Sequence, residues 1–461
     1  MDSFYDLFAM AAGNIWLYGV TFLVILSILV FIHEWGHYII ARLCGVHIET
    51  FSIGFGPEIW GFNDKRGTRW KFSAIPLGGY VKMFGDADPT SARHVEAVED
   101  AEGNSREFTD AEKEVAFYTK HVAKRAAVVF AGPAINFLFA IAILAGLYIT
   151  LGKPLTPPVA TAVDKQSPAH ESGIRPQDRF VAADGDSIND FSDIRQKVML
   201  ALDTPVTFTI LRDGERRAIE VTPERKVAED SFGFEHAKGY LGIIGPGSGI
   251  GIANIVAVDG INTKNDPEKA RALIKQRLGT TFSISLPRGE DVHELIITPP
   301  EEGEQAFKTA SGGEGVLVIS RNERQQHESY SPLSAVGIAM KETGRITYDT
   351  LTALGQMFAG TRSAQELGGI IRIGAIAGDM AERGLISLIT FTALLSINLG
   401  LINLFPIPML DGGHLVFYAI EALKGSPISD QLQEYAFRVG FVVLIGLMLF
   451  ANINDLVQIM T

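Results

Sequence analysis

The most informative stretch of this sequence is IWLYGVTFLVILSILVFIHEWGH, residues 15–37, in which an apolar run ends in a cluster of ionisable groups. The first 18 of these residues are uncharged, and about 20 apolar residues suffice for a helix to cross a bilayer. On a helix, His33 and His37 share one face, so both imidazoles can bind one metal ion. Glu34 lies beside them, where it can take a proton from metal-bound water. Such groups are costly inside an apolar helix and indicate a function.

A second stretch, NLGLINLFPIPMLDGGH at residues 398–414, ends the third apolar run. Pro406 and Pro408 must break a helix, because proline lacks the amide hydrogen and clashes with the preceding turn. A broken helix inside a membrane is tolerated only against protein or water. Asp411 is expected at this break, near the histidine pair, where its carboxylate offers a third metal ligand.

The residues alone also allow a non-functional explanation for each of the two stretches. The HExxH spacing arises by chance, and histidines at an interfacial helix end can simply be solvated. Asp411 could likewise belong to a simple helix end capped by the two glycines that follow it. His414 is expected to be structural rather than a ligand.

The composition indicates membrane spans joined to soluble domains. Of 461 residues, 47% are hydrophobic, yet 20% are charged. The apolar excess lies in four runs: Ile15–Ile32, Ala126–Gly152, Gly384–Leu410 and Val439–Asn454. The fourth is long enough to span if Arg438 lies at the interface. The net charge of −13, with no basic patch, argues against a nucleic-acid partner.

The basic residues predict the orientation in the membrane. Nine of them flank or fill the segment between the first two spans, and this segment is therefore expected on the cytoplasmic side: Arg42, Lys65, Arg66, Arg69, Lys71, Lys82, Lys120, Lys124 and Arg125. Residues 1–14 lack the basic region of a cleaved signal peptide, so the first run is expected to stay as a helix. Both termini and the long segment after the second span are then expected outside the cytoplasm.

Residues 155–300 contain an internal repeat. Phe180–Gly185 resembles Ile255–Gly260, 75 residues later, and each copy continues with a helical pattern and an alternating strand. These continuations are residues 193–202 and 206–210 in one copy, and 267–278 and 281–285 in the other. The first copy resembles bacterial-type PDZ domains through Ser167-Pro168-Ala169, Gly173-Ile174, Pro176 and Asp178, with Gln177 in place of the usual glycine. Such domains bind extended peptides by strand addition, but the pair could also merely space the membrane parts.

The HEWGH and NLFPIPMLDGG stretches, on a first and a third span, resemble the site-2 protease family of intramembrane zinc metalloproteases. Three further stretches fit the resemblance: residues 52–57, residues 75–83, and AGPAINF at residues 131–137. The resemblance covers nearly the whole chain and implies Zn²⁺ as the cofactor. It implies His33, His37 and Asp411 as the zinc ligands and Glu34 as the catalytic base.

The same resemblance implies substrate-binding residues. Asn403 would bind the substrate backbone or the developing oxyanion. The segment Trp70–Met83, which includes Gly78, Gly79 and Tyr80, would form a membrane-associated hairpin whose edge strand pairs with an unwound substrate. The alternative for this segment is a plain structural β-hairpin.

The expected fold is a polytopic α-helical membrane protein with four transmembrane helices, a membrane-associated β-hairpin and two inserted extracytoplasmic α/β PDZ domains. The expected division is 1–152 for the first two spans and the hairpin, 155–228 and 235–300 for the PDZ domains, 301–383 for a linker and an amphipathic surface helix, and 384–461 for the last two spans. Residues 86–118 are expected to form a mobile loop, because they are acidic and poor in large apolar residues.

The expected activity is hydrolysis of peptide bonds within transmembrane segments, in the inner membrane of a bacterium. The resemblance implies an anti-sigma factor of a stress-response cascade as substrate, and remnant signal peptides as further substrates. Membrane lipid and peptides at the PDZ domains are the other expected partners, and the PDZ pair is expected to filter substrates by size. The rival functions are a non-enzymatic adaptor with structural zinc and a metal transporter.

Overall fold

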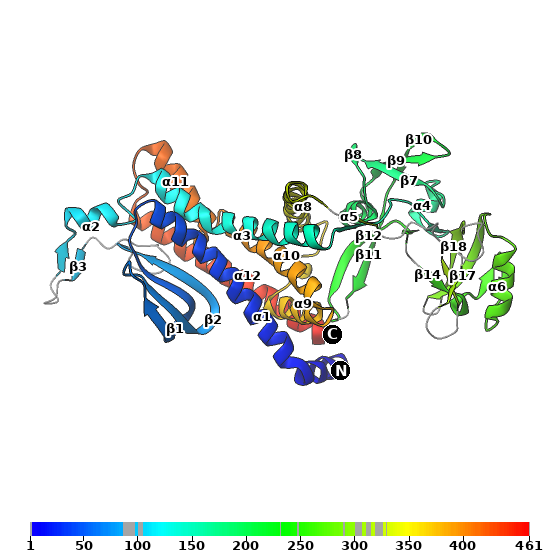
Figure 1. The fold of residues 1–461 in the computed structure, drawn as a ribbon, viewed down its shortest axis with the longest axis horizontal. Coiled ribbons are helices and arrows are strands. Elements are labelled where there is room, and N and C mark those ends of the chain that lie inside the picture. Colours follow the sequence, from blue (N-terminus) through cyan, green and yellow to red (C-terminus); the bar gives the residue numbers. More distant parts are fainter. Residues whose placement is uncertain are drawn as a thin grey trace.

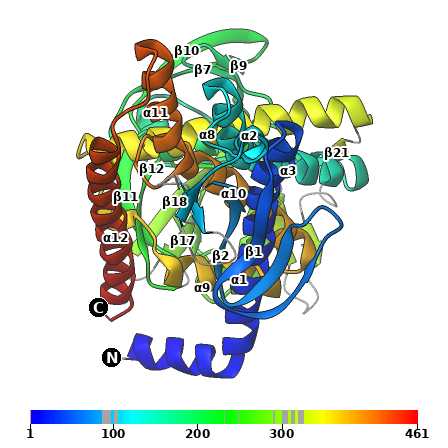
Figure 2. The ribbon, with the colours of Figure 1, turned by 90° about the vertical axis from the view of Figure 1, so that its left-hand side faces the viewer.

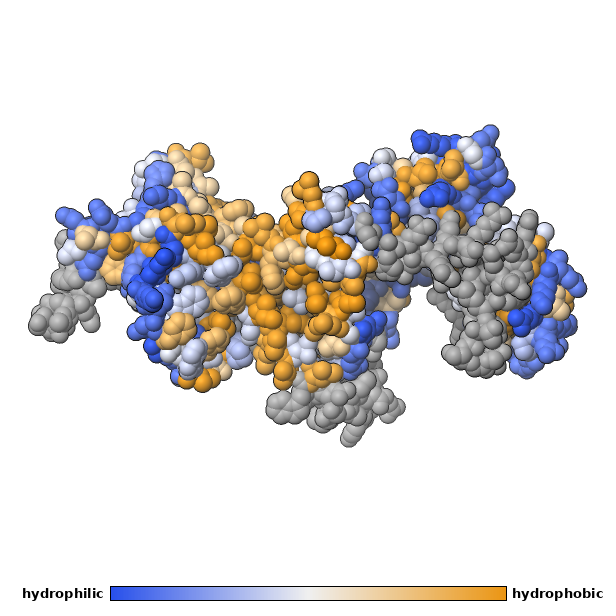
Figure 3. Space-filling view, viewed as in Figure 1, coloured by the Kyte–Doolittle hydropathy of each residue, from blue (hydrophilic) through white to orange (hydrophobic). Residues whose placement is uncertain are grey.

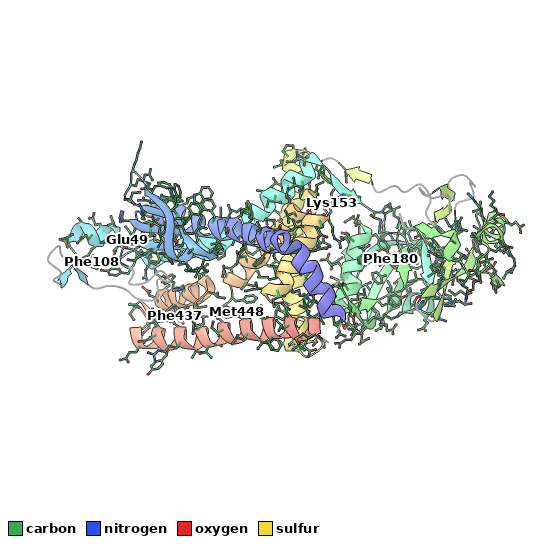
Figure 4. All side chains as sticks on the ribbon, turned by 90° about the horizontal axis from the view of Figure 1, so that it is seen from below. Glu49, Phe108, Lys153, Phe180, Phe437 and Met448 are labelled. Carbon is green, nitrogen blue, oxygen red and sulfur yellow. The ribbon has the colours of Figure 1, made fainter. Side chains whose placement is uncertain are left out.

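The computed structural model describes residues 2–85, 97–99, 105–230, 232–246, 249–288, 291–299, 307–309, 315–318, 326–328 and 330–460. The molecule is elongated, with helices in its middle, a β-hairpin at one end and sheet-rich units at the other (Figure 1). The exposed apolar side chains form a band across the middle, between two hydrophilic ends (Figure 3). Glu49 and Phe108 mark the hairpin end, Phe180 lies in the sheet-rich units, and Lys153 lies between them (Figure 4).

Four helices are long and apolar enough to cross a membrane, as the four apolar runs predict. They are α1 (Asp2–Leu43), α3 (Val122–Thr150), α10 (Leu385–Asn403) and α12 (Asp430–Met460). Both chain termini lie nearer the sheet-rich units than the hairpin (Figure 1), as an even number of crossings requires. The site that the sequence predicts lies at the other end of α1, beside the hairpin.

Small residues let α1, α3 and α10 approach closely. A Cβ on Gly36 of α1 would lie within 3.0 Å of the Ala131 carbonyl of α3, and one on Gly400 of α10 would lie 3.0 Å from the Pro133 carbonyl. Such contacts replace the hydrophobic effect as the force that holds helices together in lipid. Helix α12 lies instead on the outer flank of the bundle (Figures 1 and 2).

The segment Trp70–Met83, predicted to form a hairpin by itself, lies within the single strand β2 (Arg69–Met83), and the hairpin is completed by the preceding strand β1 (Ile48–Asn63). Residues 50–53 of β1 pair with both ends of β2, namely residues 69–72 and 79–82. Within the described residues, the 79–82 end of β2 pairs with no other strand, so its outer edge is open. Six large apolar side chains of the hairpin are exposed, as a membrane-associated element requires: Phe55, Ile59, Trp60, Phe62, Phe72 and Ile75.

The prediction of a mobile loop over 86–118 is wrong for its C-terminal part. Helix α2 (Asp110–Val115) begins with a capping box in which Thr109 and Glu112 bond each other's backbone amides. Phe108 and Phe117 are buried. Phe117 packs in the core formed with the hairpin, and Phe108 packs on Phe84 and Tyr118. Residues 86–96 and 100–104 lie outside the described residues, and only the backbone of the short strands β3 (Ala97–Glu99) and β4 (Ser105–Glu107) is described between and after them.

The two repeat copies fold alike, each as a helix packed on antiparallel strands. The first copy comprises α4 (Pro168–Glu171), β7 (Arg179–Ala183), β8 (Asp186–Ser187), α5 (Phe191–Leu200), β9 (Val206–Arg212) and β10 (Glu215–Val221). The second comprises β14 (Gly249–Gly251), η1 (Ile252–Asn254), β15 (Ala257–Val258), β16 (Ile261–Asn262), α6 (Pro267–Lys275), β17 (Phe282–Arg288) and β18 (Asp291–Ile297). The order β10-β9-β7-β8 in one sheet is matched by β18-β17-β15-β16 in the other. This architecture is compatible with PDZ-like domains.

The two copies share strands. Strand β6 (Ala162–Asp164) precedes the first copy in the chain but pairs with β18 of the second and with β13 (Ile243–Ile244). Because side chains alternate across a strand, Val163 enters the core of the first copy and Ala162 that of the second. Asp164 is buried, and its carboxylate accepts hydrogen bonds from the hydroxyl of Tyr240 and from Nδ1 of His293. Strand β6, which lies in the first expected domain (155–228), therefore pairs within the sheet of the second (235–300).

The remaining elements lie between or beside the repeat units and the membrane helices. They are β5 (Lys153–Leu155), β11 (Glu224–Glu229), β12 (Glu235–Tyr240), β19 (Phe307–Thr309), β20 (Gly315–Val318), β21 (Gln326–Glu328), α8 (Pro332–Phe358), η2 (Ala364–Glu366), α9 (Ile370–Glu382) and α11 (Asp411–Lys424). Helix α8 lies within residues 301–383, where the sequence predicts a linker and an amphipathic surface helix. Helix α9, in the same segment, was not predicted. Much of the first part of this segment, residues 301–330, lies outside the described residues.

Candidate active site

Three side chains from α1 and α11 converge at the hairpin end of the bundle. His33 Nε2 lies 3.1 Å from Asp411 Oδ2, and His37 Nε2 lies 3.6 Å from the same oxygen. The two Nε2 atoms are 3.3 Å apart. Within the described residues, this trio is the only group of His, Cys, Asp or Glu side chains with metal-binding geometry.

This triangle has the dimensions of a zinc site. Zinc binds imidazole and carboxylate tetrahedrally at about 2.0–2.1 Å, which puts neighbouring ligand atoms about 3.3 Å apart. His37 Nδ1 lies 2.9 Å from the Val128 carbonyl, which can only accept a hydrogen bond, so the Nε2 of a neutral His37 carries a lone pair. Asp411 Oδ2 is buried and has no hydrogen-bond donor within the described part of the chain. Such a cluster of ligand atoms could hold a metal ion, and the donor set fits Zn²⁺.

Glycine makes the two halves of the site fit together. A Cβ on Gly132 of α3 would lie within 3.0 Å of atoms of both His33 and His37. A Cβ on Gly412 or Gly413 would lie within 3.0 Å of backbone atoms of the segment 404–408. Any larger residue at these three positions would push α3 or the helix break away from the ligands.

The break before Asp411 follows from the two prolines. Helix α10 ends at Asn403, and α11 begins at Asp411 itself. Met409, two residues earlier, has a φ of 88°, a left-handed conformation that is unusual for a large side chain. Such strain persists only where the surroundings impose it, and here it turns the chain so that Asp411 faces the histidines.

Glu34 and Asn403 lie beside the trio. Asn403 Nδ2 is 3.5 Å from His33 Nε2. Glu34 lies under the open end of β2, where a Cβ on Gly79 would approach Glu34 Cγ to 3.2 Å and the Val81 backbone bonds to the Glu34 carboxylate. Glu34, Asn403 and the trio line one cavity of about 290 Å³, together with Gly78, Gly79 and Tyr80. The structure thus gathers in one place every site residue that the sequence predicts.

His414 is not part of the metal-binding trio. Its ring packs on Phe437 of α12, with the centroids 5.2 Å apart, although it also lines the cavity. Gly132, Asn136 and Phe117 also lie around the site, and no role for them is predicted from the sequence. Gly132 and Asn136 belong to the AGPAINF stretch at residues 131–137, which is the sequence signal that points to them.

Comparison with known proteins agrees with this geometry. Residues 21–447 match the protein family described as Peptidase family M50. The chain belongs to peptidase family M50. This peptidase is 37% identical, over 97% of both chains, to a protein of Agrobacterium fabrum that is named as a zinc metalloprotease. It is 31% identical to the regulator of sigma E protease of Haemophilus influenzae, over 96% of this chain and 99% of that one.

Membership of family M50 decides between the protease and the rival functions that the sequence left open. The protein is a multi-pass membrane protein and a site-2-type zinc metalloprotease of regulated intramembrane proteolysis. Its cofactor is Zn²⁺, which the trio of His33, His37 and Asp411 could bind. The adaptor and transporter readings are set aside.

Proposed function

We propose that this protease hydrolyses peptide bonds within transmembrane segments, with His33, His37 and Asp411 as its zinc ligands and Glu34 as its general base. The observation that carries the proposal is the convergence of these four side chains in one cavity beside an open strand edge. Zinc held there would supply the Lewis acidity that lowers the pKa of a water molecule and polarises the scissile carbonyl. Glu34 accepts the proton of that water and passes it to the leaving nitrogen.

Substrate binding is proposed to occur at the open edge of β2. A transmembrane helix hides its peptide bonds in its own hydrogen bonds, so it must unwind before it can be cut. The backbone of residues 79–82 can pair with an extended segment, because its outer edge has no strand partner among the described residues. Gly78, Gly79 and Tyr80 line the cavity there, which supports their role in holding the segment over Glu34. Asn403 donates to the developing oxyanion through its amide, beside the zinc ligand His33.

The proposed location is the bacterial inner membrane. The hairpin and the active site lie toward the cytoplasm, and the termini and the repeat units lie on the periplasmic side. The basic residues around the hairpin support this orientation. The two repeat units are proposed to be PDZ domains that bind peptides and exclude substrates with a bulky periplasmic domain. A variant lacking residues 155–300 should then cut full-length substrate that the intact protein rejects.

The proposed substrate is a membrane-spanning anti-sigma factor, with remnant signal peptides as a second class. The similarity to a protein named regulator of sigma E protease supports the first.

The Glu34→Gln variant tests the base. Glutamine keeps the shape of the side chain but cannot accept the proton, so cleavage of a tagged transmembrane substrate should fall at least about 100-fold. Zinc content should be unchanged, because Glu34 is not a ligand in this assignment. Retained cleavage would remove Glu34 from its role.

The Asp411→Asn variant tests the third ligand. An amide is a poorer zinc ligand than a carboxylate and brings no negative charge, so zinc affinity should fall by at least about tenfold. Competition with a chelator measures this on the purified protein. Unchanged zinc affinity would exclude Asp411 as a ligand and leave it as a helix-terminal residue.

A further inference from the structure

Asn136 of α3 touches the candidate zinc site from behind. It is fully buried, and its carboxamide nitrogen Nδ2 lies 3.0 Å from His33 Nδ1. Its carboxamide oxygen Oδ1 is buried as well and has no hydrogen-bond partner within the described residues. A buried oxygen without a donor loses its hydrogen bond to water and gains none in return, so the amide is poorly satisfied in this orientation.

The two orientations of the amide correspond to the two tautomers of His33. A half-turn about the Cβ–Cγ bond exchanges the oxygen and the nitrogen, and the hydrogen-bond network decides between them. If Nδ2 donates to His33 Nδ1, the imidazole proton is on Nε2, and that nitrogen has no lone pair for a metal. If Oδ1 faces His33 instead, Nδ1–H donates to it and Nε2 carries a free lone pair toward Asp411.

We propose that Asn136 is the positioning residue that selects the zinc-binding tautomer of His33, by accepting a hydrogen bond from Nδ1–H through Oδ1. This inference rests on the assignment of His33 as a zinc ligand in the proposed function. The turned amide gives the partnerless oxygen a donor and leaves Nε2 free for the metal. Metal-bound histidines commonly donate their other ring N–H to an oxygen in this way.

His37 supports the inference by being held in the same manner. Its Nδ1 lies 2.9 Å from the Val128 carbonyl, also on α3, and a carbonyl can only accept. Both imidazoles therefore direct Nδ1 at α3 and Nε2 at the ligand triangle. Helix α3 sets the tautomer of one histidine with a backbone carbonyl and that of the other with Asn136.

The position of Asn136 is held independently of its side chain. Ser396 of α10 donates to the Asn136 carbonyl at 2.8 Å, and both residues are fully buried. Apolar packing of Ala140 on α3 with Ala393 and Ile397 on α10 also holds the two helices together, so the backbone position does not depend on this one bond. Replacing the carboxamide therefore changes the partner of His33 while the backbone stays in place.

Zinc affinity of the purified full-length protein, measured by chelator competition, tests the inference. Asn136→Leu keeps the volume but offers no acceptor, and it should bind zinc about 10- to 100-fold more weakly. Asn136→Asp restores an acceptor and should return the affinity to within a few-fold of the wild type. Ser396→Ala is the matched control, because it removes the neighbouring buried hydrogen bond without touching His33, and its zinc affinity should stay unchanged.

The outcomes separate this inference from the proposed function. Asn136→Leu with wild-type affinity, or Asn136→Asp as weak as Asn136→Leu, would overturn the tautomer role. His33→Ala belongs to the same series. If it also leaves zinc affinity unchanged, the ligand assignment itself is wrong. If it weakens zinc binding while the Asn136 variants do not, only the positioning role fails.

Discussion

At the scale of single residues, glycine sets the distances on which the site depends. Gly132 is the point at which α3 passes the two imidazoles, and a Cβ there would lie within 3.0 Å of atoms of both rings. Met409 shows the opposite case, a large residue held at a φ of 88° so that Asp411 can turn toward α1. Glycine is unfavourable inside a helix, and a positive φ is unfavourable for methionine. Both are present here because the three ligands must lie close together.

Gly132→Ala should weaken zinc binding by at least about tenfold while leaving the helix intact. Alanine favours a helix by about 1 kcal/mol over glycine, so helix formation alone would gain from the change. The added methyl group forces α3 or the imidazoles aside. Chelator competition measures the affinity, and Gly146→Ala is the control on the same helix, since its Cβ meets nothing within 4 Å. Equal zinc affinity in the two variants would show that the approach at Gly132 is not critical.

At the scale of elements, α9 depends on another helix for its N-terminal cap. Its N-cap residue is Gly369, which has no side chain to accept from the first turn. Asp455 of α12 accepts instead from the amides of Gly369 and Arg372, at 2.9 and 3.0 Å, and Asn452 accepts from the amide of Ile370 at 3.1 Å. The carboxylate lies at the positive end of the helix dipole. Two helices far apart in the sequence are joined by this cap.

Asp455→Ala should lower the stability of the folded protein by about 2 kcal/mol, because it leaves two buried amides without an acceptor. Thermal unfolding in detergent measures the change. Asp379→Ala, which removes only the ion pair with Arg383 at the far end of α9, should cost less than about 0.5 kcal/mol. Similar losses in the two variants would argue against the cap.

At the scale of the whole molecule, the hairpin of β11 and β12 docks the repeat units on the membrane helices. Arg362 donates to the Ala237 carbonyl at 3.0 Å, and Arg372 donates to His236 Nδ1 at 2.7 Å while lying over the ring of Phe234. Because His236 accepts this bond, it must be neutral when the hairpin is docked. Burial, and next the charge of Arg372, lower the pKa of His236 below its ordinary value of 6.5.

This docking should loosen on acidification. The negative charges of Asp230 and Glu366 favour protonated His236, but burial, Arg372 and Lys238 outweigh them. A free hairpin takes up the proton near pH 6.5, whereas the docked one resists it, so the contribution to docking is present above that pH and declines below it. Hydrogen-exchange protection of residues 234–240 should therefore fall from pH 7.5 to 5.5. His236→Gln, which keeps an acceptor but cannot titrate, should show no such fall; an equal fall in both would exclude His236 as the cause.

Much of this architecture could be predicted from the sequence, because it depends on local periodicity. The four apolar runs became four helices, with the third ending at Asn403 ahead of its prolines. The amphipathic pattern became α8, and the 75-residue repeat became two sheets of matching strand order. The prediction of a mobile loop was wrong for the C-terminal part of 86–118, because composition does not show that Phe108 and Phe117 are buried. Phe117 packs against the hairpin, and Phe108 packs on Phe84 and Tyr118.

The sequence by itself determined that His33 and His37 share a helix face, because four residues make about one turn. It also determined that the chain must break before Asp411, because proline cannot continue a helix. Only the tertiary structure decided that the Val128 carbonyl and Asn136 stand behind the two imidazoles, and that β6 completes the sheet of the second repeat copy. These contacts join segments up to about 130 residues apart, and they depend on how closely helices and strands pack rather than on any local pattern.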